Sequence, residues 1–156
     1  MKKIYDLYEI SAIVKKLKQQ KKKIVLSHGV FDLLHIGHIK HFDYAKKFGD
    51  KLIVSITKDK FIDKGPKRPF FNLKLRMEAV AALESVDYVT YGNLDSSVDI
   101  IEKIKPNIYV KGQDYKNHKD DVTGKIYDEK KIVEKFKGKL KYTNEIRFSS
   151  TNLLHH

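Results

Sequence analysis

The sequence predicts an α/β fold in which a doubly wound parallel sheet of about five strands carries helices on both faces. Short apolar runs rich in β-branched residues alternate with longer segments of helical periodicity, and this alternation is typical of βαβ units. Each polar stretch of unusual composition follows one of the predicted strands. Because parallel sheets bind ligands beyond the carboxyl ends of their strands, these stretches indicate a site at one edge of the sheet.

The helices are predicted from apolar side chains that recur at helical spacing. Residues 4–18 carry isoleucine, leucine and valine at helical spacing with lysine and other polar residues between them, which predicts an amphipathic helix within the N-terminal segment 1–22. Gly49 and Asp50 end the second predicted helix, and Pro106 ends the fourth. The helices after the first are predicted over 36–48, 73–83, 96–105 and about 126–137.

The strands are predicted from short β-rich runs bounded by turn residues. KIVLS at 23–27 ends at His28 and Gly29. KLIVSIT at 51–57 precedes a segment, 58–72, whose Gly-Pro and second proline predict a long loop of the kind that is often functional. The other strands are predicted over 86–92, 107–112 and 139–143.

The chain of 156 residues is long enough for one compact domain, which we expect over residues 1–154. His155 and His156 resemble the remains of a purification tag and are left out of the functional reasoning. No apolar run is long enough to span a bilayer, and the N-terminus lacks a signal-peptide pattern, so a cytoplasmic protein without a membrane partner is expected. The absence of cysteine excludes disulfides, thiolate zinc sites and a cysteine nucleophile.

The net charge of +12 is compatible with polynucleotides or with phosphorylated small molecules as partners. Lysines are spread through the chain, with one dense run at 15–23, and 20 carboxylates lie among them. Most of these lysines are expected to form a solvated surface. No recognised nucleic-acid motif accompanies the charge, so nucleic acid is not an expected partner, and a non-catalytic nucleotide- or nucleic-acid-binding protein is the alternative to an enzyme.

The stretch HGVFDLLHIGH at 28–38 contains three of the seven histidines. If a helix begins near 34–36, His35 and His38 lie on one face of its first turn and look into the crevice. The N-terminus of a helix offers unpaired N–H groups and a partial positive charge to phosphate, and two imidazoles add side-chain donors. Gly29 and Gly37 lack side chains where a nucleotide could approach the backbone.

Structural alternatives stay open for this stretch. A histidine in such a helix is most often structural. The pair of His35 and His38 could also be half of a zinc site completed by Asp32 or His28, but phosphate chemistry with magnesium fits the surrounding lysines better. Asp32 could be the N-cap of the helix, in addition to any role in orienting a catalytic histidine.

On these residues the chain resembles the cytidylyltransferase-like nucleotidyltransferase family. The match is closest to the domain that adenylylates heptose 1-phosphate, and next to the glycerol-3-phosphate cytidylyltransferases. Besides GVFDLLHIGH, the resemblance includes GDKLIVSITKD (49–59), KGPKRP (64–69), RMEAVAAL (76–83), VDYV (86–89), KPNIYVKGQDY (105–115) and SST (149–151).

The resemblance implies a Rossmann-like domain that transfers a CMP or AMP group from CTP or ATP to a phosphorylated sugar or polyol and releases pyrophosphate. It further implies Mg²⁺ as a cofactor that accompanies the NTP, with no protein ligand expected for the metal, and a homodimer as the assembly. An aminoacyl-tRNA synthetase fragment would share the HIGH motif, but the chain lacks a late KMSKS-type signature.

The resemblance also implies roles for individual residues. The expected catalytic residues are His35, His38 and Lys64, which stabilise the negative charge of the transferring α-phosphoryl group. The residues expected to bind the nucleotide are Gly29, Val30, Phe31, Asp32, Gly37, Lys111, Asp114, Ser149, Ser150 and Thr151. The residues expected to bind the acceptor or the phosphates are Lys58, Arg68 and Arg76.

Several of these positions have structural alternatives. Lys58 and Lys64 could be ordinary solvated lysines, and Arg76 could pair with Glu78 or with a neighbouring strand end. Asp114 could only shape a turn, and Ser149 could only cap a helix.

Three departures from the family pattern leave the nucleotide base and the acceptor open. Ile36 stands where the cytidylyl relatives usually carry an aromatic residue, which weakens the glycerol-phosphate assignment. Arg147 lies directly before Phe148, where the role of the family's arginine does not carry over. The stretch 116–126 has no counterpart in the shorter glycerol-phosphate enzymes, and it could select the acceptor or be a surface insertion.

Overall fold

The computed structural model describes residues 2–62, 65, 67–93, 96–112 and 125–143. Within them, five strands form one sheet in the order β3-β2-β1-β4-β5, and every neighbouring pair is parallel. The predicted α/β fold with a parallel sheet is confirmed. The strands are β1 (Ile24–Gly29), β2 (Lys51–Ile56), β3 (Tyr88–Tyr91), β4 (Ile108–Lys111) and β5 (Lys139–Tyr142).

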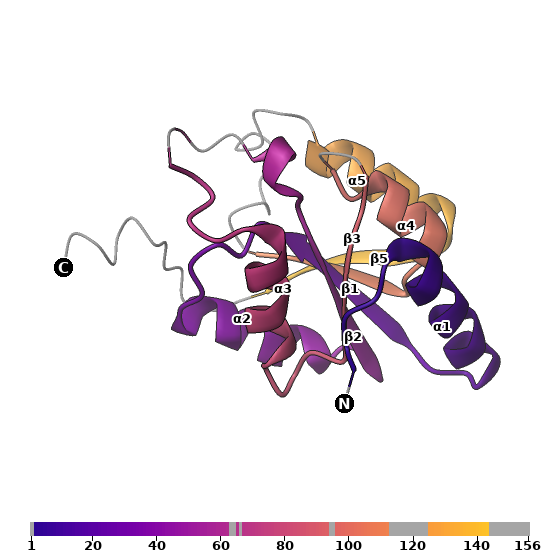
Figure 1. The fold of residues 1–156 in the computed structure, drawn as a ribbon. Helices are drawn as coiled ribbons and strands as arrows, with labels where there is room; N and C mark the ends of the chain where they lie inside the picture. The colour runs from indigo at the N-terminus through magenta and orange to yellow at the C-terminus, as the bar shows by residue number, and fades with distance from the viewer. Residues whose placement is uncertain (1, 63–64, 66, 94–95, 113–124, 144–156) are drawn as a thin grey trace.

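Helices cover both faces of the sheet, as the alternating pattern predicts (Figure 1). One face carries α2 (Ile36–Lys46) and α3 (Leu73–Ala81). The other face carries α1 (Leu7–Gln19), α4 (Val98–Ile104) and α5 (Lys125–Lys135). A short 3₁₀ helix, η1 (Asp59–Phe61), follows β2 at the start of the long loop.

The central strand β1 delivers the histidine-rich stretch to the edge of the sheet where a ligand site is expected. Its register pairs Gly29 with Ile56 of β2 and Ser27 with Val110 of β4, so the three strands end at nearly the same level. The chain continues from β1 to β2 on one side and later returns to β4 on the other side. At such a reversal of strand order, parallel sheets bind ligands beyond the carboxyl ends of the strands, here those of β1 and β4.

Side chains alternate between the two faces along each strand, so each face of the sheet has its own apolar core. Between the sheet and the α2 and α3 helices lie Val25, Phe42, Val54, Met77 and Val80, together with further apolar residues. Between the sheet and the α1, α4 and α5 helices lie Ile10, Leu26, Ile53, Ile101 and Tyr109. Burial of each such isoleucine or leucine side chain contributes about 1.5–3 kcal/mol, so these cores hold the site edge rigid.

The first helix begins at Leu7, later than the predicted residue 4. Asp6 is its N-cap and forms a capping box with Glu9, in which each carboxylate accepts the other residue's backbone N–H. Ile4 instead forms an isolated parallel bridge with Val89 of β3 and packs against the core on the α2 and α3 face. The apolar period runs through residue 4 because that side chain is partly buried against the core of the sheet.

Some of the predictions fall on residues outside the described ranges, and for these they stay predictions. These residues are Lys64, Asp114, Arg147, Ser149, Ser150, Thr151 and the polar stretch 113–124. Among the helices of the described ranges, none is both long enough and apolar enough to cross a membrane.

Candidate active site

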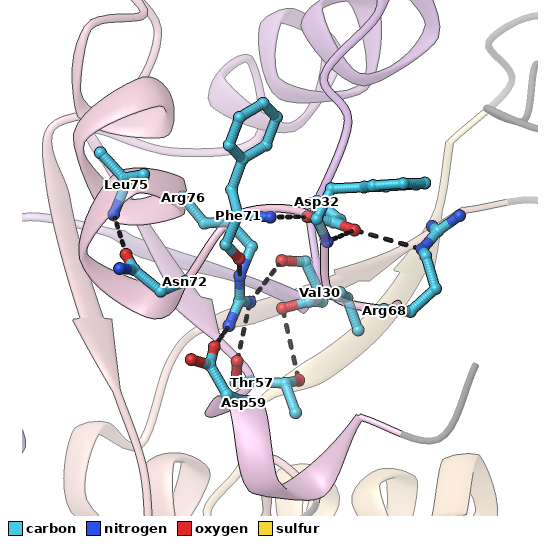
Figure 2. A network of polar contacts seen from close by, with 11 residues as sticks. Val30, Asp32, Thr57, Asp59, Arg68, Phe71, Asn72, Leu75 and Arg76 are labelled. Carbon is cyan, nitrogen blue, oxygen red and sulfur yellow. Dashed lines mark hydrogen bonds and ion pairs between the residues drawn. The ribbon is translucent and has the colours of Figure 1, made fainter. Parts of the chain in front are cut away.

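The predicted site residues that the structure describes lie around the carboxyl edge of the sheet. The β1–α2 connection contributes the residues from Val30 to His38, β2 is followed by Lys58, and β4 ends at Lys111. The end of the long loop and the start of α3 lie against the β1–α2 connection, as Figure 2 shows. Four chain segments therefore meet at this edge.

His35 and His38 cap the N-terminus of α2 with their own rings. His35 is the N-cap, and its Nδ1 accepts the N–H of Gly37 at 3.1 Å. The N–H of His35 donates to Nδ1 of His38 at 3.2 Å, which completes a capping box. The prediction that a helix begins near 34–36 is confirmed, although His35 precedes the first helical residue.

The two imidazoles lie next to each other at a tilt, and the capping contacts define which nitrogen of each ring is the donor. Their ring centroids are 4.0 Å apart, and the ring planes are inclined by 39°. Because each Nδ1 accepts a backbone N–H, the proton of each neutral ring is carried by Nε2. The pair therefore carries two N–H groups beside the helix N-terminus, a combination that suits phosphate oxygens, and Nε2 of His35 is buried in the structure.

Phe31 occupies the space that the sequence assigns to a nucleotide at Gly29. A Cβ added at Gly29 would lie 2.7 Å from Cζ of Phe31, so the glycine is needed to accommodate this ring. The same ring packs edge-on against His38, with centroids 5.8 Å apart, and against Phe42, with centroids 5.0 Å apart. The backbone of Phe31 is left-handed, with φ of 52°, a conformation that bulky residues adopt only under constraint.

Asp32 holds the end of the long loop, and its interpretation as an N-cap is wrong because His35 caps α2. Its carboxylate accepts the N–H of Phe70 at 2.7 Å and the N–H of Phe71 at 2.9 Å. Nε of Arg68 lies 3.2 Å from the same carboxylate. These groups surround a side chain that is only 2% exposed, and the prediction that Asp32 binds the nucleotide stays a prediction.

Arg76 is buried beneath the site, and the prediction that it binds the acceptor or a phosphate stays a prediction. Its guanidinium donates to three backbone carbonyl oxygens, those of Val30, Thr57 and Phe71, at 2.8–2.9 Å (Figure 2). It also forms an ion pair with Asp59, rather than with Glu78. The side chain is fully buried, so the planar fork ties the ends of β1 and β2 to the start of α3.

Two of the predicted cationic residues, Lys58 and Lys111, lie at the carboxyl edge of the sheet. Lys58 follows β2, and its Nζ donates to Oδ1 of Asn93 at 2.9 Å and lies 5.4 Å from the ring centroid of Tyr91. Lys111 ends β4, and its Nζ lies 3.8 Å from a carboxylate oxygen of Glu129 on α5. Nothing local in the sequence marks Glu129, because its partner Lys111 lies in a different element, β4.

The structure also brings together polar residues that the sequence analysis did not assign to the site. Nδ1 of His28 is hydrogen-bonded to Oγ of Ser55 at 2.7 Å, and Nε2 of His28 lies 3.3 Å from Oγ1 of Thr57. His41 is hydrogen-bonded to Ser27 at 2.8 Å. The signal was present in the sequence, since each of these strands is apolar until its last residues and then turns polar.

The geometry gives no support to the zinc alternative within the described ranges. No group of three or more histidine, aspartate or glutamate side chains comes together there in a way that could hold a metal ion. Asp32, one of the two proposed third ligands, faces Arg68 and two backbone N–H groups instead.

The cytidylyltransferase-like family matches residues 26–155, which include most of β1, the other four strands and the histidine pair. The chain belongs to this family. The predicted resemblance is thereby confirmed, and the expectation of a nucleotidyltransferase is confirmed at the level of the family.

The curated relatives that the chain matches are bifunctional proteins much longer than the chain. The chain is 42% identical over 133 residues to the bifunctional protein HldE of Sulfurimonas denitrificans, covering 84% of the chain and 28% of that protein. It is 41% identical over 141 residues to the bifunctional protein HldE of Aliarcobacter butzleri, covering 89% of the chain and 29% of that protein. The chain thus spans less than a third of the length of these relatives.

Solved structures share the fold. A lipopolysaccharide core biosynthesis protein from Thermoplasma volcanium matches with a TM-score of 0.64 and 26% identity, over 82% of this chain and 99% of that one. A pantoate-β-alanine ligase from Francisella tularensis, bound to a β-γ ATP ligand and β-alanine, matches with a TM-score of 0.64 over 99% of this chain and 76% of that one. At 18% identity, this second likeness shows the fold alone.

Proposed function

We propose that this cytidylyltransferase-like domain transfers a nucleotidyl group from an NTP to the phosphate of a phosphorylated sugar or polyol. An oxygen of the acceptor phosphate attacks the α-phosphorus of the NTP, a new P–O–P bond forms, and the bond between the α-phosphorus and the oxygen bridging to the β-phosphorus breaks. Pyrophosphate leaves with that oxygen. The products are a nucleotide-activated sugar or polyol and pyrophosphate.

The observation that carries the proposal is the capping pair of His35 and His38. Phosphoryl transfer needs little covalent chemistry from the protein, so catalysis depends on positioning and on stabilising the charge that spreads over the equatorial oxygens. The two Nε2–H donors and the N-terminus of α2 supply that stabilisation at one place. Lys58 at the end of β2 adds a cation for the outer or acceptor phosphates, as would Lys64, which lies outside the described ranges.

Within this class we favour ATP and a phosphorylated sugar over CTP and a polyol. The chain resembles the domain that adenylylates heptose 1-phosphate, and Ile36 departs from the aromatic residue usual in the cytidylyl relatives. The Thermoplasma volcanium protein, named for lipopolysaccharide core biosynthesis, is a relative whose name also points to sugar chemistry.

Magnesium is proposed to enter with the NTP as its phosphate complex. The carboxylates nearest the histidines, Asp32 and Asp59, are paired with Arg68 and Arg76, so the described side chains offer the ion no cluster of ligands. A homodimer is a further proposal that rests on the resemblance, and sedimentation equilibrium tests it.

The decisive experiment measures pyrophosphate release with Mg²⁺, each of the four NTPs, and a panel of sugar 1-phosphates and polyol phosphates. We expect release with ATP and at least one sugar 1-phosphate, and little release without the acceptor. A thermal-shift titration with the same NTPs separates binding from turnover, because a ligand that binds only the native state raises Tm. A Tm shift with no release for any acceptor would favour a non-catalytic nucleotide-binding protein and contradict the proposal.

A further inference from the structure

We propose that Arg76 and Asp32 are positioning residues that set the orientation of the His38 imidazole, acting through Phe31. The structural part of this proposal depends only on contacts within the protein. Its kinetic part rests on the proposed function. Neither residue is assigned a contact with substrate.

The backbone between β1 and α2 is held in place on both sides of Phe31. Phe31 has a left-handed backbone, with φ of 52°, and it lies between two residues that are each held by a buried charge. On one side Nη1 of Arg76 donates to the carbonyl oxygen of Val30 at 2.9 Å. On the other side the Asp32 carboxylate accepts two N–H groups of the long loop. These flanking bonds hold Phe31 in a conformation that its own side chain disfavours.

The Phe31 ring contacts one of the two histidines, His38, directly. The Phe31 ring is seated over Gly29 and meets the His38 ring edge-on, with an interplanar angle of 85°. On its other side His38 faces His35, and its Nδ1 accepts the His35 N–H. The direction of the His38 Nε2–H donor therefore depends on where the Phe31 ring lies.

The hydrogen bonds of Arg76 and Asp32 depend on the shapes of the guanidinium and the carboxylate. The Arg76 fork reaches Val30, Thr57 and Phe71 at once, and a lysine ammonium on a flexible stem cannot donate to all three in the same geometry. The Asp32 carboxylate accepts from two consecutive N–H groups, one with each oxygen, whereas an asparagine has only one acceptor oxygen. Arg76→Lys and Asp32→Asn thus disturb the geometry while changing size little.

The test observes the histidine ring nitrogens by ¹⁵N NMR in the protein without substrate, with resonances assigned from His38→Gln. In the unsubstituted protein we expect Nε2 of His38 to carry the proton and Nδ1 to be the acceptor. In Arg76→Lys and in Asp32→Asn, the His38 resonances should shift or broaden while those of His41, held by Ser27 on the same sheet face, stay in place. Lys46→Gln is the matched control, because it removes an ion pair with Asp87 at the opposite edge of the sheet.

Unchanged His38 resonances in both folded variants would overturn the proposal. Shifts of His41 as large as those of His38 would also overturn it, since the substitutions would then loosen the whole molecule. If either variant fails to fold, Phe31→Leu removes the ring contact directly and should shift the His38 resonances in the same way. These results do not depend on any substrate, so they stand apart from a failure of the proposed function.

Kinetics distinguish positioning from direct phosphate binding. For a displaced His38 donor we expect kcat to fall by about ten- to a hundredfold, with KM for both substrates changed by less than about threefold. A large rise in KM for the phosphorylated acceptor with kcat nearly unchanged would mean that Arg76 contacts the phosphate, and would overturn the proposal.

Discussion

At the scale of single residues, the two histidines perform two tasks with different atoms. Nδ1 of each ring satisfies a backbone N–H in the first turn of α2, where no carbonyl of the helix is available. This use of Nδ1 makes Nε2 the protonated nitrogen, so the capping interaction also defines the donor offered to a ligand.

Replacing His38 by alanine should therefore leave the fold intact but slow turnover. Loss of the capping interaction costs about 1 kcal/mol, which a domain with two apolar cores tolerates. Loss of one transition-state donor should reduce kcat by about 10²–10³-fold. Steady-state pyrophosphate release checks this, with circular dichroism confirming the fold.

His38→Gln is the conservative comparison, because its side-chain amide can donate from a position near that of Nε2. It should retain more turnover than His38→Ala. Near-normal turnover in the alanine variant would show that His38 is not catalytic.

At the scale of elements, a buried carboxylate joins α4, β4 and α5. Glu129 on α5 accepts from the hydroxyls of Ser97, at the start of α4, and Tyr109, in β4, and its other oxygen lies 3.8 Å from Nζ of Lys111. Ser97 is the N-cap of α4 yet makes no capping hydrogen bond, because its hydroxyl serves Glu129 instead. The position of Lys111 at the site edge therefore depends on α5, the helix that follows β4 in the chain.

Glu129→Leu should destabilise the domain strongly. The substitution removes the carboxylate partner of a buried lysine and of two buried hydroxyls, a class of change that costs about 3–5 kcal/mol. Urea unfolding followed by circular dichroism measures the loss. Tyr109→Phe is the control, because it removes one of the hydrogen bonds and should cost about 1 kcal/mol. A loss from Glu129→Leu no greater than that from Tyr109→Phe would contradict the view that the carboxylate is the centre of this network.

At the scale of the whole molecule, the sheet separates two apolar cores, and its outer strands bring tyrosines into partly buried positions. Burial raises the pKa of Tyr88 in β3, the nearby charges of Asp87 and Tyr5 raise it further, and Lys46 opposes them. Burial alone raises the pKa of Tyr142 in β5. Both outer strands of the sheet therefore carry a phenol that resists ionisation.

These shifts predict a loss of stability in alkali. Because the pKa in the folded state lies above the unfolded value of about 10, the contribution is fully present below that value and is lost as pH rises through the folded pKa. The free energy of unfolding in urea, measured from pH 8 upward, should therefore fall above about pH 10. Tyr88→Phe should reduce that fall, and Tyr8→Phe, at a tyrosine that is 87% exposed, is the matched control. Equal alkaline losses in all three proteins would contradict the prediction.

Much of the fold is predictable because the signals are local. β1 and α2 are visible in the sequence as an apolar run and a periodic segment, and the motif between them is contiguous. The exceptions are positions whose partners come from elsewhere. Ile4 continues the apolar period of α1 but is bound to Val89 of β3, a pairing that no local pattern reveals.

The sequence by itself determined the α/β class, the edge of the sheet where the site lies and the histidine pair, because period, turn residues and a short motif are all properties of neighbouring residues. Only the tertiary structure decided the roles of Asp32, Arg76 and Glu129. Arg76 meets Val30 across 46 positions of the chain, and Asp32 meets Phe70 across 38. Whether a charged side chain faces a ligand or the protein depends on which distant groups bury it, and in this domain the side chains of Asp32 and Arg76 are buried against such groups.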